Sequence, residues 1–259
     1  METLAVALLA LCTTGWFVLA GTDLGSGMLL PWLGRGDSER RLVLASFAPF
    51  FLGNEVWLVA TAGVLVGCFP ALEGELLSGQ APVLVALLAG WIVRDAGLWS
   101  RGRGPEARWR AACDAGVTAG SWAVALSWGL LLAALLTGRP YEPATGPVAV
   151  VAAAAVAALF AAHGLAFASL RLTGAPYQRA RRLVGRAGRP WHPLALTAVL
   201  LGGLPLWAGS ALPLAERAAA PGTLALLVPA LAVVTPLLAA VQGWIWYTFR
   251  GRVTGPSYL

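Results

Sequence analysis

Seven runs of apolar residues, separated by short polar segments, constrain this chain more than any other feature of its sequence. A helix needs roughly 20 consecutive apolar residues to cross the hydrocarbon core of a bilayer. In that core the backbone must satisfy its own hydrogen bonds, and an α-helix does so within one segment. The sequence therefore predicts an all-α, polytopic integral membrane bundle with about seven transmembrane helices, forming a single transmembrane domain over residues 1–259. The runs extend over about Leu4–Gly21, Ala45–Phe69, Pro82–Trp99, Asp114–Leu136, Val148–Leu170, Pro193–Leu212 and Thr223–Tyr247.

The composition excludes a soluble globular protein. Charged residues make up 12% of the chain, against roughly 25% in a typical soluble domain. The mean hydropathy is +0.74 and the formal net charge is +6, with all 18 basic residues being arginine. These arginines do not indicate nucleic-acid binding, because they cluster in short loops between the apolar runs.

Arginine-rich loops alternate with arginine-poor ones along the chain. Cytoplasmic loops of membrane proteins carry an excess of arginine and lysine. The first, third and fifth loops and the C-terminal tail are therefore expected in the cytoplasm, and the N-terminus outside. The N-terminal residues have no basic region and no clear cleavage site, so they are expected to form the first span and not a signal peptide. Contact with anionic membrane lipids is a second expected role of the basic loops.

Two polar residues, Asn54 and Glu55, lie near the middle of the second apolar run. An ionised carboxylate in the membrane interior is costly unless it is protonated, paired or close to water. Glu55 is therefore a candidate for a proton route or for a buried contact with a ligand. The alternative is a protonated Glu55 that bonds to a neighbouring helix and only stabilises the packing. The sequence leaves both interpretations open.

Four charged residues fall close to the expected cytoplasmic ends of their spans: Asp23, Arg94, Asp95 and Asp114. If Arg94 lies inside the apolar zone it must be paired, and Asp23 and Asp114 are the expected partners. These residues then form one charge network at the membrane interface. Ordinary snorkelling of each side chain to the interface is the alternative.

No metal site is expected in the chain. The three cysteines, Cys12, Cys68 and Cys113, follow no metal-ligand spacing and lie in or beside apolar runs. His163 lies within the fifth run, and an imidazole is a common axial ligand of haem. No second histidine stands at helical spacing from it, so a hydrogen-bonded packing histidine is the favoured interpretation.

Three consecutive motifs give the chain a family resemblance. They are Gly21-Thr22-Asp23-Leu24-Gly25-Ser26-Gly27-Met28-Leu29, Gly34-Arg35-Gly36-Asp37-Ser38-Glu39-Arg40-Arg41 and Gly53-Asn54-Glu55-Val56-Trp57-Leu58. In order and spacing they resemble subunit II of the cytochrome bd-type quinol oxidases, whose first two helices carry G-x-D-x-G-x-G-M-L, G-x-x-D-x-E-R-R and G-N-(Q/E)-V-W-L. Arg94 and Asp114 also fit the family pattern. The resemblance is specific from about Gly21 to Arg110.

The resemblance implies a subunit of a respiratory terminal oxidase in the bacterial cytoplasmic membrane, which oxidises quinol and reduces oxygen to water. It places haem b, haem d and the main quinol site in a partner, subunit I, so no complete active site and no catalytic residue are expected in this chain. A heterodimer with subunit I is also implied, while small accessory subunits and a structurally bound quinone, whose type the sequence does not give, are left open. Asp23, Asn54, Glu55, Trp57 and Arg94 carry over as motif positions.

The chain departs from the family pattern in two respects. Phe51 and Leu52 stand where better-known members carry a histidine and an acid, so a proton route through that acid would be absent here or rerouted through Glu55. The chain is also shorter, with a pair of helices expected to be missing between the sixth and seventh spans. Two other functions remain open: a non-catalytic structural subunit, and a small-solute transporter. The transporter is disfavoured because no pair of broken helices repeats across two halves of the chain.

Overall fold

Helices make up all the regular structure of the part of the chain that the structure, a computed structural model, describes: residues 1–185 and 191–255. Seven of these helices are long and apolar enough to cross a membrane, which confirms the predicted all-α bundle and the number of spans. They are α1 (Glu2–Met28), α3 (Asp37–Cys68), α5 (Ala81–Ser100), α6 (Ala107–Leu136), α7 (Gly146–Arg171), α9 (Trp191–Gly209) and α10 (Pro221–Thr248).

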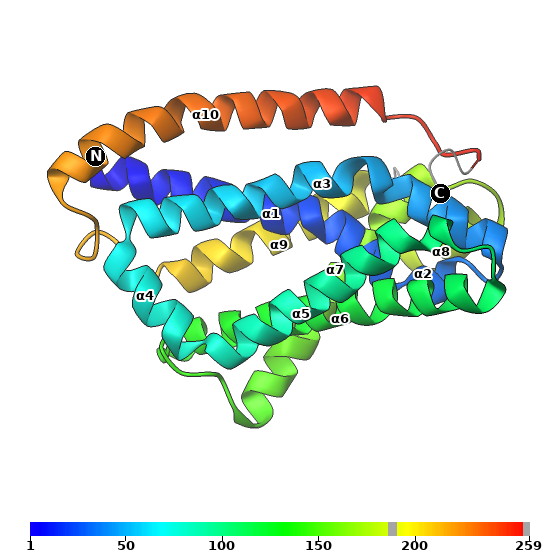
Figure 1. The fold of residues 1–259 in the computed structure, drawn as a ribbon, viewed down its shortest axis with the longest axis horizontal. Coiled ribbons are helices and arrows are strands. Elements are labelled where there is room, and N and C mark those ends of the chain that lie inside the picture. Colours follow the sequence, from blue (N-terminus) through cyan, green and yellow to red (C-terminus); the bar gives the residue numbers. More distant parts are fainter. Residues whose placement is uncertain (186–190, 256–259) are drawn as a thin grey trace.

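Shorter helices connect several of the spans. They are α2 (Leu30–Leu33), α4 (Pro70–Gly79), the 3-10 turn η1 (Arg101–Arg103) and α8 (Gly174–Val184). Helix α8 forms in the basic fifth loop, and Arg186 and Arg189 of the same loop lie outside the described residues. Figure 1 shows the long helices running side by side, with α1 inside the bundle and α10 along its outer edge.

Close backbone contact holds α1 against α7. A Cβ atom on Gly25 would overlap the carbonyl oxygen of Phe160 and would lie 2.7 Å from the amide nitrogen of Gly164. A Cβ atom on Gly164 would in turn overlap the backbone of Gly25. The glycine-dense end of the first span therefore serves helix packing, and α1 continues without a break as far as Met28.

An aromatic cluster fills the middle of the bundle between α1, α5, α6 and α7. The Trp16 ring lies 4.8 Å from that of Trp128, 5.1 Å from that of Phe17 and 6.1 Å from that of Trp91, measured between centroids. Phe160 of α7 closes the cluster, 5.8 Å from Phe17. Such rings fix the distances between the four helices, which determines where the polar side chains next to them meet.

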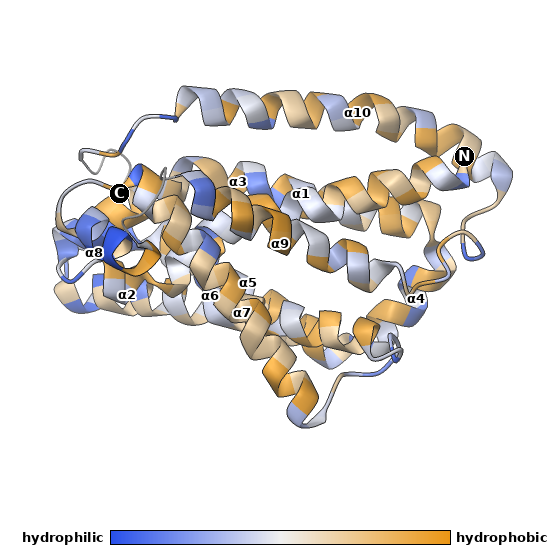
Figure 2. Ribbon diagram, turned by 180° about the vertical axis from the view of Figure 1, so that it is seen from behind, coloured by the Kyte–Doolittle hydropathy of each residue, from blue (hydrophilic) through white to orange (hydrophobic). Residues whose placement is uncertain are grey.

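The arginine-rich segments gather at one end of the bundle. Figure 2 shows hydrophilic residues concentrated around α2 and α8, with apolar residues along the long helices. Arg179 of α8 donates to the carbonyl oxygen of Leu33 at 2.7 Å, and the Val253 amide of the C-terminal tail donates to the Arg171 carbonyl oxygen at 2.8 Å. The opposite end holds α4, where Glu75 pairs with Arg217 of the loop before α10 at 2.9 Å. This arrangement agrees with the alternation of loops expected from the sequence.

Candidate functional site

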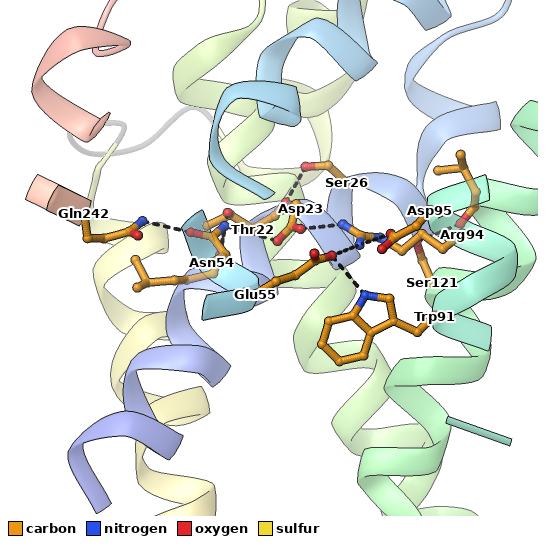
Figure 3. Close-up of polar contacts among 12 residues, drawn as sticks. Thr22, Asp23, Ser26, Asn54, Glu55, Trp91, Arg94, Asp95, Ser121 and Gln242 are labelled. Carbon is orange, nitrogen blue, oxygen red and sulfur yellow. Dashed lines mark hydrogen bonds and ion pairs between the residues drawn. The ribbon is translucent and has the colours of Figure 1, made fainter. Parts of the chain in front are cut away.

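A buried arginine, Arg94 of α5, brings together three carboxyl groups from three helices (Figure 3). Its Nη2 is ion-paired with Oδ2 of Asp23 on α1. Its Nη1 lies 3.2 Å from Oε1 of Glu55 on α3 and 2.8 Å from Oδ1 of the adjacent Asp95. Only 2% of the Arg94 side chain and 1% of the Asp23 side chain are exposed. We call these four residues the Arg94 cluster.

Two side chains of α5 bind Glu55. Its Oε1 accepts one hydrogen bond from Trp91 Nε1 at 2.9 Å and another from Arg94 Nη1 at 3.2 Å. Trp91 and Arg94 are three residues apart, so they lie on the same face of α5. The Glu55 side chain is 18% exposed, unlike that of Asp23. Within the cluster, Asp23 is therefore the inner carboxyl group, while Glu55 reaches the surface of the chain.

Asn54 connects the cluster to α10. Its Nδ2 donates to the Leu19 carbonyl oxygen at 3.0 Å and to Asp23 Oδ1 at 3.4 Å. Its Oδ1 accepts a hydrogen bond at 2.8 Å from Nε2 of Gln242, a buried residue of α10. A hydrogen-bonded chain thus runs from the outermost helix through α3 to α1.

Sequence reasoning missed Trp91 and Gln242. Gln242 had a visible signal, because it is an amide within the apolar seventh run, just as Asn54 is within the second. Trp91 had none, since a tryptophan in an apolar run is most often a packing residue. Its role as a hydrogen-bond donor follows only from the side-chain contact between α5 and α3.

The charges of the cluster do not balance. One guanidinium faces three carboxyl groups, so a fully ionised cluster would carry a net charge of −2. A net charge is costly in a membrane interior, and ionisable groups there pair with one another or take up protons. For the cluster to be neutral, two of its three negative charges must therefore be balanced by protons or by further cations.

A small cavity of about 10 Å³ lies inside the cluster, lined by Trp16, Asp23, Glu55, Trp91 and Arg94 among others. Two of the buried donors around it, Trp16 Nε1 and Arg94 Nε, have no hydrogen-bond partner among the described residues. A cavity of about this size holds one water molecule when polar groups are available to bind it. The cavity therefore offers a site for a water molecule between the inner and the outer carboxyl group.

Asp114 lies outside the Arg94 cluster, so the prediction that it belongs to the Arg94 network is wrong. Its carboxylate pairs with Arg101 Nε at 2.5 Å and with Arg40 Nη1 at 3.3 Å. Arg101 follows Arg94 by about two helical turns, and the short connection after η1 places the start of α6 opposite Arg101. Asp37 at the start of α3 also binds Arg101, at 2.9 Å. Arg101, Asp114, Asp37 and Arg40 thus form a second ion-pair group, which the sequence did not predict.

Trp57 also lies apart from the cluster. Its ring covers Gly15 of α1, where a Cβ atom would overlap the indole. The side chain is buried at 6% exposure. Its position in the family motif thus corresponds to a close contact between α3 and α1.

His163 has partners for both ring nitrogens inside the chain. Nδ1 lies 2.7 Å from Oγ1 of Thr197 on α9, and Nε2 lies 3.0 Å from the carbonyl oxygen of Val18 on α1. The residue is 1% exposed. Among the described residues, no group of three or more His, Cys, Asp or Glu side chains is arranged to hold a metal ion.

A protein-family model described as cytochrome bd terminal oxidase subunit II matches residues 1–215 of the chain. The chain belongs to this family. The match contains the whole Arg94 cluster and Asn54, whereas α10 with Gln242 lies beyond it. The resemblance inferred from the three motifs is therefore confirmed.

Curated bacterial relatives of the subunit II family are 31% to 37% identical to this chain over the stretches that align. The cytochrome bd-I ubiquinol oxidase subunit 2 of Escherichia coli strain K12 is 37% identical over 128 residues, which is 49% of this chain and 34% of the relative. The cytochrome bd ubiquinol oxidase subunit 2 of Bacillus subtilis strain 168 is 31% identical over 186 residues, or 68% of this chain and 55% of the relative. The chain thus spans about a third to just over half of the length of these relatives.

Proposed function

We propose that the chain serves as the second subunit of a bacterial membrane oxidase that oxidises quinol and reduces oxygen to water. Membership of the subunit II family and the names of the relatives, both ubiquinol oxidase subunits, support this function. Haem b, haem d and the main quinol site are assigned to the partner subunit I. His163 does not fit a haem ligand, because both of its ring nitrogens are already bonded within the fold.

The face formed by α3 and α5 is the proposed contact with subunit I. It exposes large apolar side chains, among them Leu52, Val59 and Ile92, each more than half exposed. Glu55 and Asp95 are partly exposed on the same helices, with 18% and 23% of their side chains accessible. Lipid tails cannot form hydrogen bonds with these carboxyl groups, so exposing them to lipid costs more free energy than covering them with a protein surface.

Glu55 is proposed as a protonation site on a route towards the partner. Leu52, which replaces the usual acid of the family, is 52% exposed on α3. Glu55 follows it by three residues and therefore lies on the same side of the helix, one turn further along. Glu55 has three properties that suit a protonation site: it belongs to a cluster with excess negative charge, its side chain is partly exposed, and it lines a cavity that can hold water. The single observation that carries the proposal is this partly exposed carboxyl group beside a buried, over-compensated arginine.

The test is Glu55→Gln in the purified complex, with Glu75→Gln as the matched control. Glu75 is also an ion-paired acid, but it lies at the other end of the bundle and pairs with Arg217. We expect Glu55→Gln to lower oxygen consumption per haem and proton uptake while the complex still assembles, because glutamine keeps the hydrogen bonds but cannot carry a proton. The control should leave all three quantities unchanged. Unaltered turnover, proton uptake and assembly in Glu55→Gln would rule out the proton role.

A structural role of the cluster is the alternative, favoured by the two hydrogen bonds that Glu55 receives from α5. In that case Glu55→Gln lowers the yield or the thermal stability of the complex but leaves turnover per haem intact. The two outcomes differ in which quantity changes, so one set of measurements distinguishes them.

The arginine-rich end of the bundle is proposed to face the cytoplasm, with the N-terminus on the other side. A fluorescent protein fused to the C-terminus tests this orientation, because green fluorescent protein matures in the cytoplasm but not when exported through the general secretion route. A dark fusion that is still inserted and full-length would reverse the assignment.

A further inference from the structure

Arg171, which is buried like Arg94 and Arg101, has no acidic partner among the described residues. It is the last residue of α7 and is 6% exposed. Its Nη1 donates to the carbonyl oxygen of Gly251 in the C-terminal tail, and its guanidinium lies 5.2 Å from the centroid of the Phe50 ring. Its Nε is buried and has no hydrogen-bond partner in residues 1–185 and 191–255. A guanidinium is always charged, so its positive charge is only partly compensated in this position.

The acidic groups at this end of the bundle are already bonded to other arginines. Their ion pairs are Asp37 with Arg101 and Arg110, Glu39 with Arg179, Glu106 with Arg108, and Asp114 with Arg40 and Arg101. The C-terminal tail adds positive charge next to Arg171 through Arg250 and Arg252. A buried charge is costly unless it is paired, and none of these acids remains to pair with Arg171 among the described residues.

A pocket of about 520 Å³ lies beside Arg171, with Ala45 and Pro49 of α3 on one side and residues of the tail on the other. Two hydrogen bonds at Val253 attach the tail to the end of α7. The Val253 amide donates to the Arg171 carbonyl oxygen at 2.8 Å, and Thr173 Oγ1 donates to the Val253 carbonyl oxygen at 2.7 Å. The pocket is therefore part of the folded chain and has a buried cation in its wall.

We propose that this pocket binds the phosphate group of an anionic membrane phospholipid, with Arg171 as the buried cation. Guanidinium groups bind phosphate oxygens through paired, charge-assisted hydrogen bonds. The pocket lies where α7 and α10 end and beside Ala45 and Pro49, about two to three turns into α3, at the level that lipid headgroups occupy beside spanning helices. Next to it, Val241, Trp244 and Tyr247 of α10 are between 51% and 68% exposed and offer an apolar surface for an acyl chain. The inference does not depend on the proposed oxidase function.

The charge of Arg252 supports the same site from the tail. Arg252 lines the pocket, and its guanidinium lies 4.5 Å from the centroid of the Tyr177 ring on α8. Unlike Arg171, it is an exposed residue of the tail. We therefore expect Arg252 to contribute to the attraction of the phosphate, and Arg171 to dominate its binding.

The experiment compares three probes on the full-length chain purified with its natural partners and then depleted of lipid. The probes are dioleoylphosphatidylglycerol, dioleoylphosphatidylcholine and inorganic phosphate. Thermal unfolding and native mass spectrometry measure the stabilisation and the bound lipid. We expect phosphatidylglycerol to stabilise the wild type and to remain bound, phosphatidylcholine to do so weakly, and inorganic phosphate to have no comparable effect. An equal effect of inorganic phosphate would overturn the assignment to a lipid.

Arg171→Gln should lower the apparent affinity for phosphatidylglycerol about tenfold, because the neutral amide can still bond to Gly251 but lacks the charge. Arg103→Gln is the matched control: it removes one exposed arginine from the same end of the bundle and does not line the pocket. If Arg171→Gln fails to assemble, Arg252→Gln replaces it, with a smaller but measurable loss expected. Equal lipid binding by the control and the pocket variants would overturn the proposal.

Discussion

Removing the cation of the Arg94 cluster should destabilise the fold far more than removing any one of its acids. Arg94 is the only positively charged member of the cluster, and its guanidinium contacts Asp23, Glu55 and Asp95. Arg94→Gln therefore leaves three carboxyl groups facing one another. Removing one partner of a buried ion pair costs roughly 3–5 kcal/mol. Because Asp23 is 1% exposed and cannot turn to water, we expect a loss in that range.

Glu55→Gln should behave differently. The acids outnumber the cation, so the loss of one carboxylate removes repulsion as well as attraction. Glutamine can still accept the hydrogen bond from Trp91, and the Glu55 side chain is 18% exposed. We expect a change of about 1 kcal/mol or less, which is the net contribution of a typical hydrogen bond.

The double variant Arg94→Gln with Asp23→Asn makes the comparison quantitative. If the two residues stabilise the fold mainly through their pairing, the double variant should recover part of the loss of Arg94→Gln. Coupling energies of residues in one salt-bridge network are roughly 0.5–3 kcal/mol. The coupling between Arg94 and Asp23 should fall in the upper half of this range, since both side chains are almost completely buried.

Unfolding of the chain by sodium dodecyl sulfate in mixed micelles, followed by tryptophan fluorescence, measures these free energies. The protein has 12 tryptophans, and Trp16, Trp91 and Trp128 lie next to the cluster or in the aromatic core beside it. An Arg94→Gln variant that unfolds at the same detergent fraction as Glu55→Gln would refute the reasoning. It would mean that water or lipid headgroups reach the cluster and screen its charges.

Two further predictions concern the packing around the site. Gly25→Ala should destabilise the fold by about 1–3 kcal/mol, because the added methyl group meets the backbone of α7. Gly63→Ala on α3 is the control, since its methyl group would enter open space and should not destabilise the fold. The same unfolding titration compares the two variants, and equal effects would contradict the close contact between α1 and α7. His163→Phe should cost roughly 1–3 kcal/mol through the lost hydrogen bonds, and the haem absorption bands of the purified complex should not change. A lost or shifted haem band would show that His163 contacts a haem.

Several features of the protein followed from the sequence because they depend on local properties. The seven spans were predictable since hydrophobic length is a property of each segment alone. The end of α1 around Gly21–Gly27 is dense in glycine, a composition that allows helices to approach closely, and the structure shows this packing against α7. The need of Arg94 for a partner also followed, because a buried charge must be compensated wherever it lies.

The identity of the partners depended on tertiary structure. Asp23 and Asp114 were equally suitable partners of Arg94 in the sequence, yet only Asp23 bonds to it. The choice is made by the register between helices: the contact of Gly25 with Gly164 sets the position of α1, and the short turn after α5 places Asp114 opposite Arg101. Gln242 was visible as a polar residue in an apolar run, but its bond to Asn54 required α10 to lie against α3.

The sequence by itself thus determined the class of the fold, the number of spans and the family, because apolar length and short motifs are written along the chain. Only the tertiary structure decided which charges meet, that Glu55 stands at the exposed edge of the cluster, and that no described acid pairs with Arg171. The physical reason is that a hydrogen bond or an ion pair has a short range. Its formation depends on helix register to within a few ångströms, and residues more than a hundred positions apart set that register.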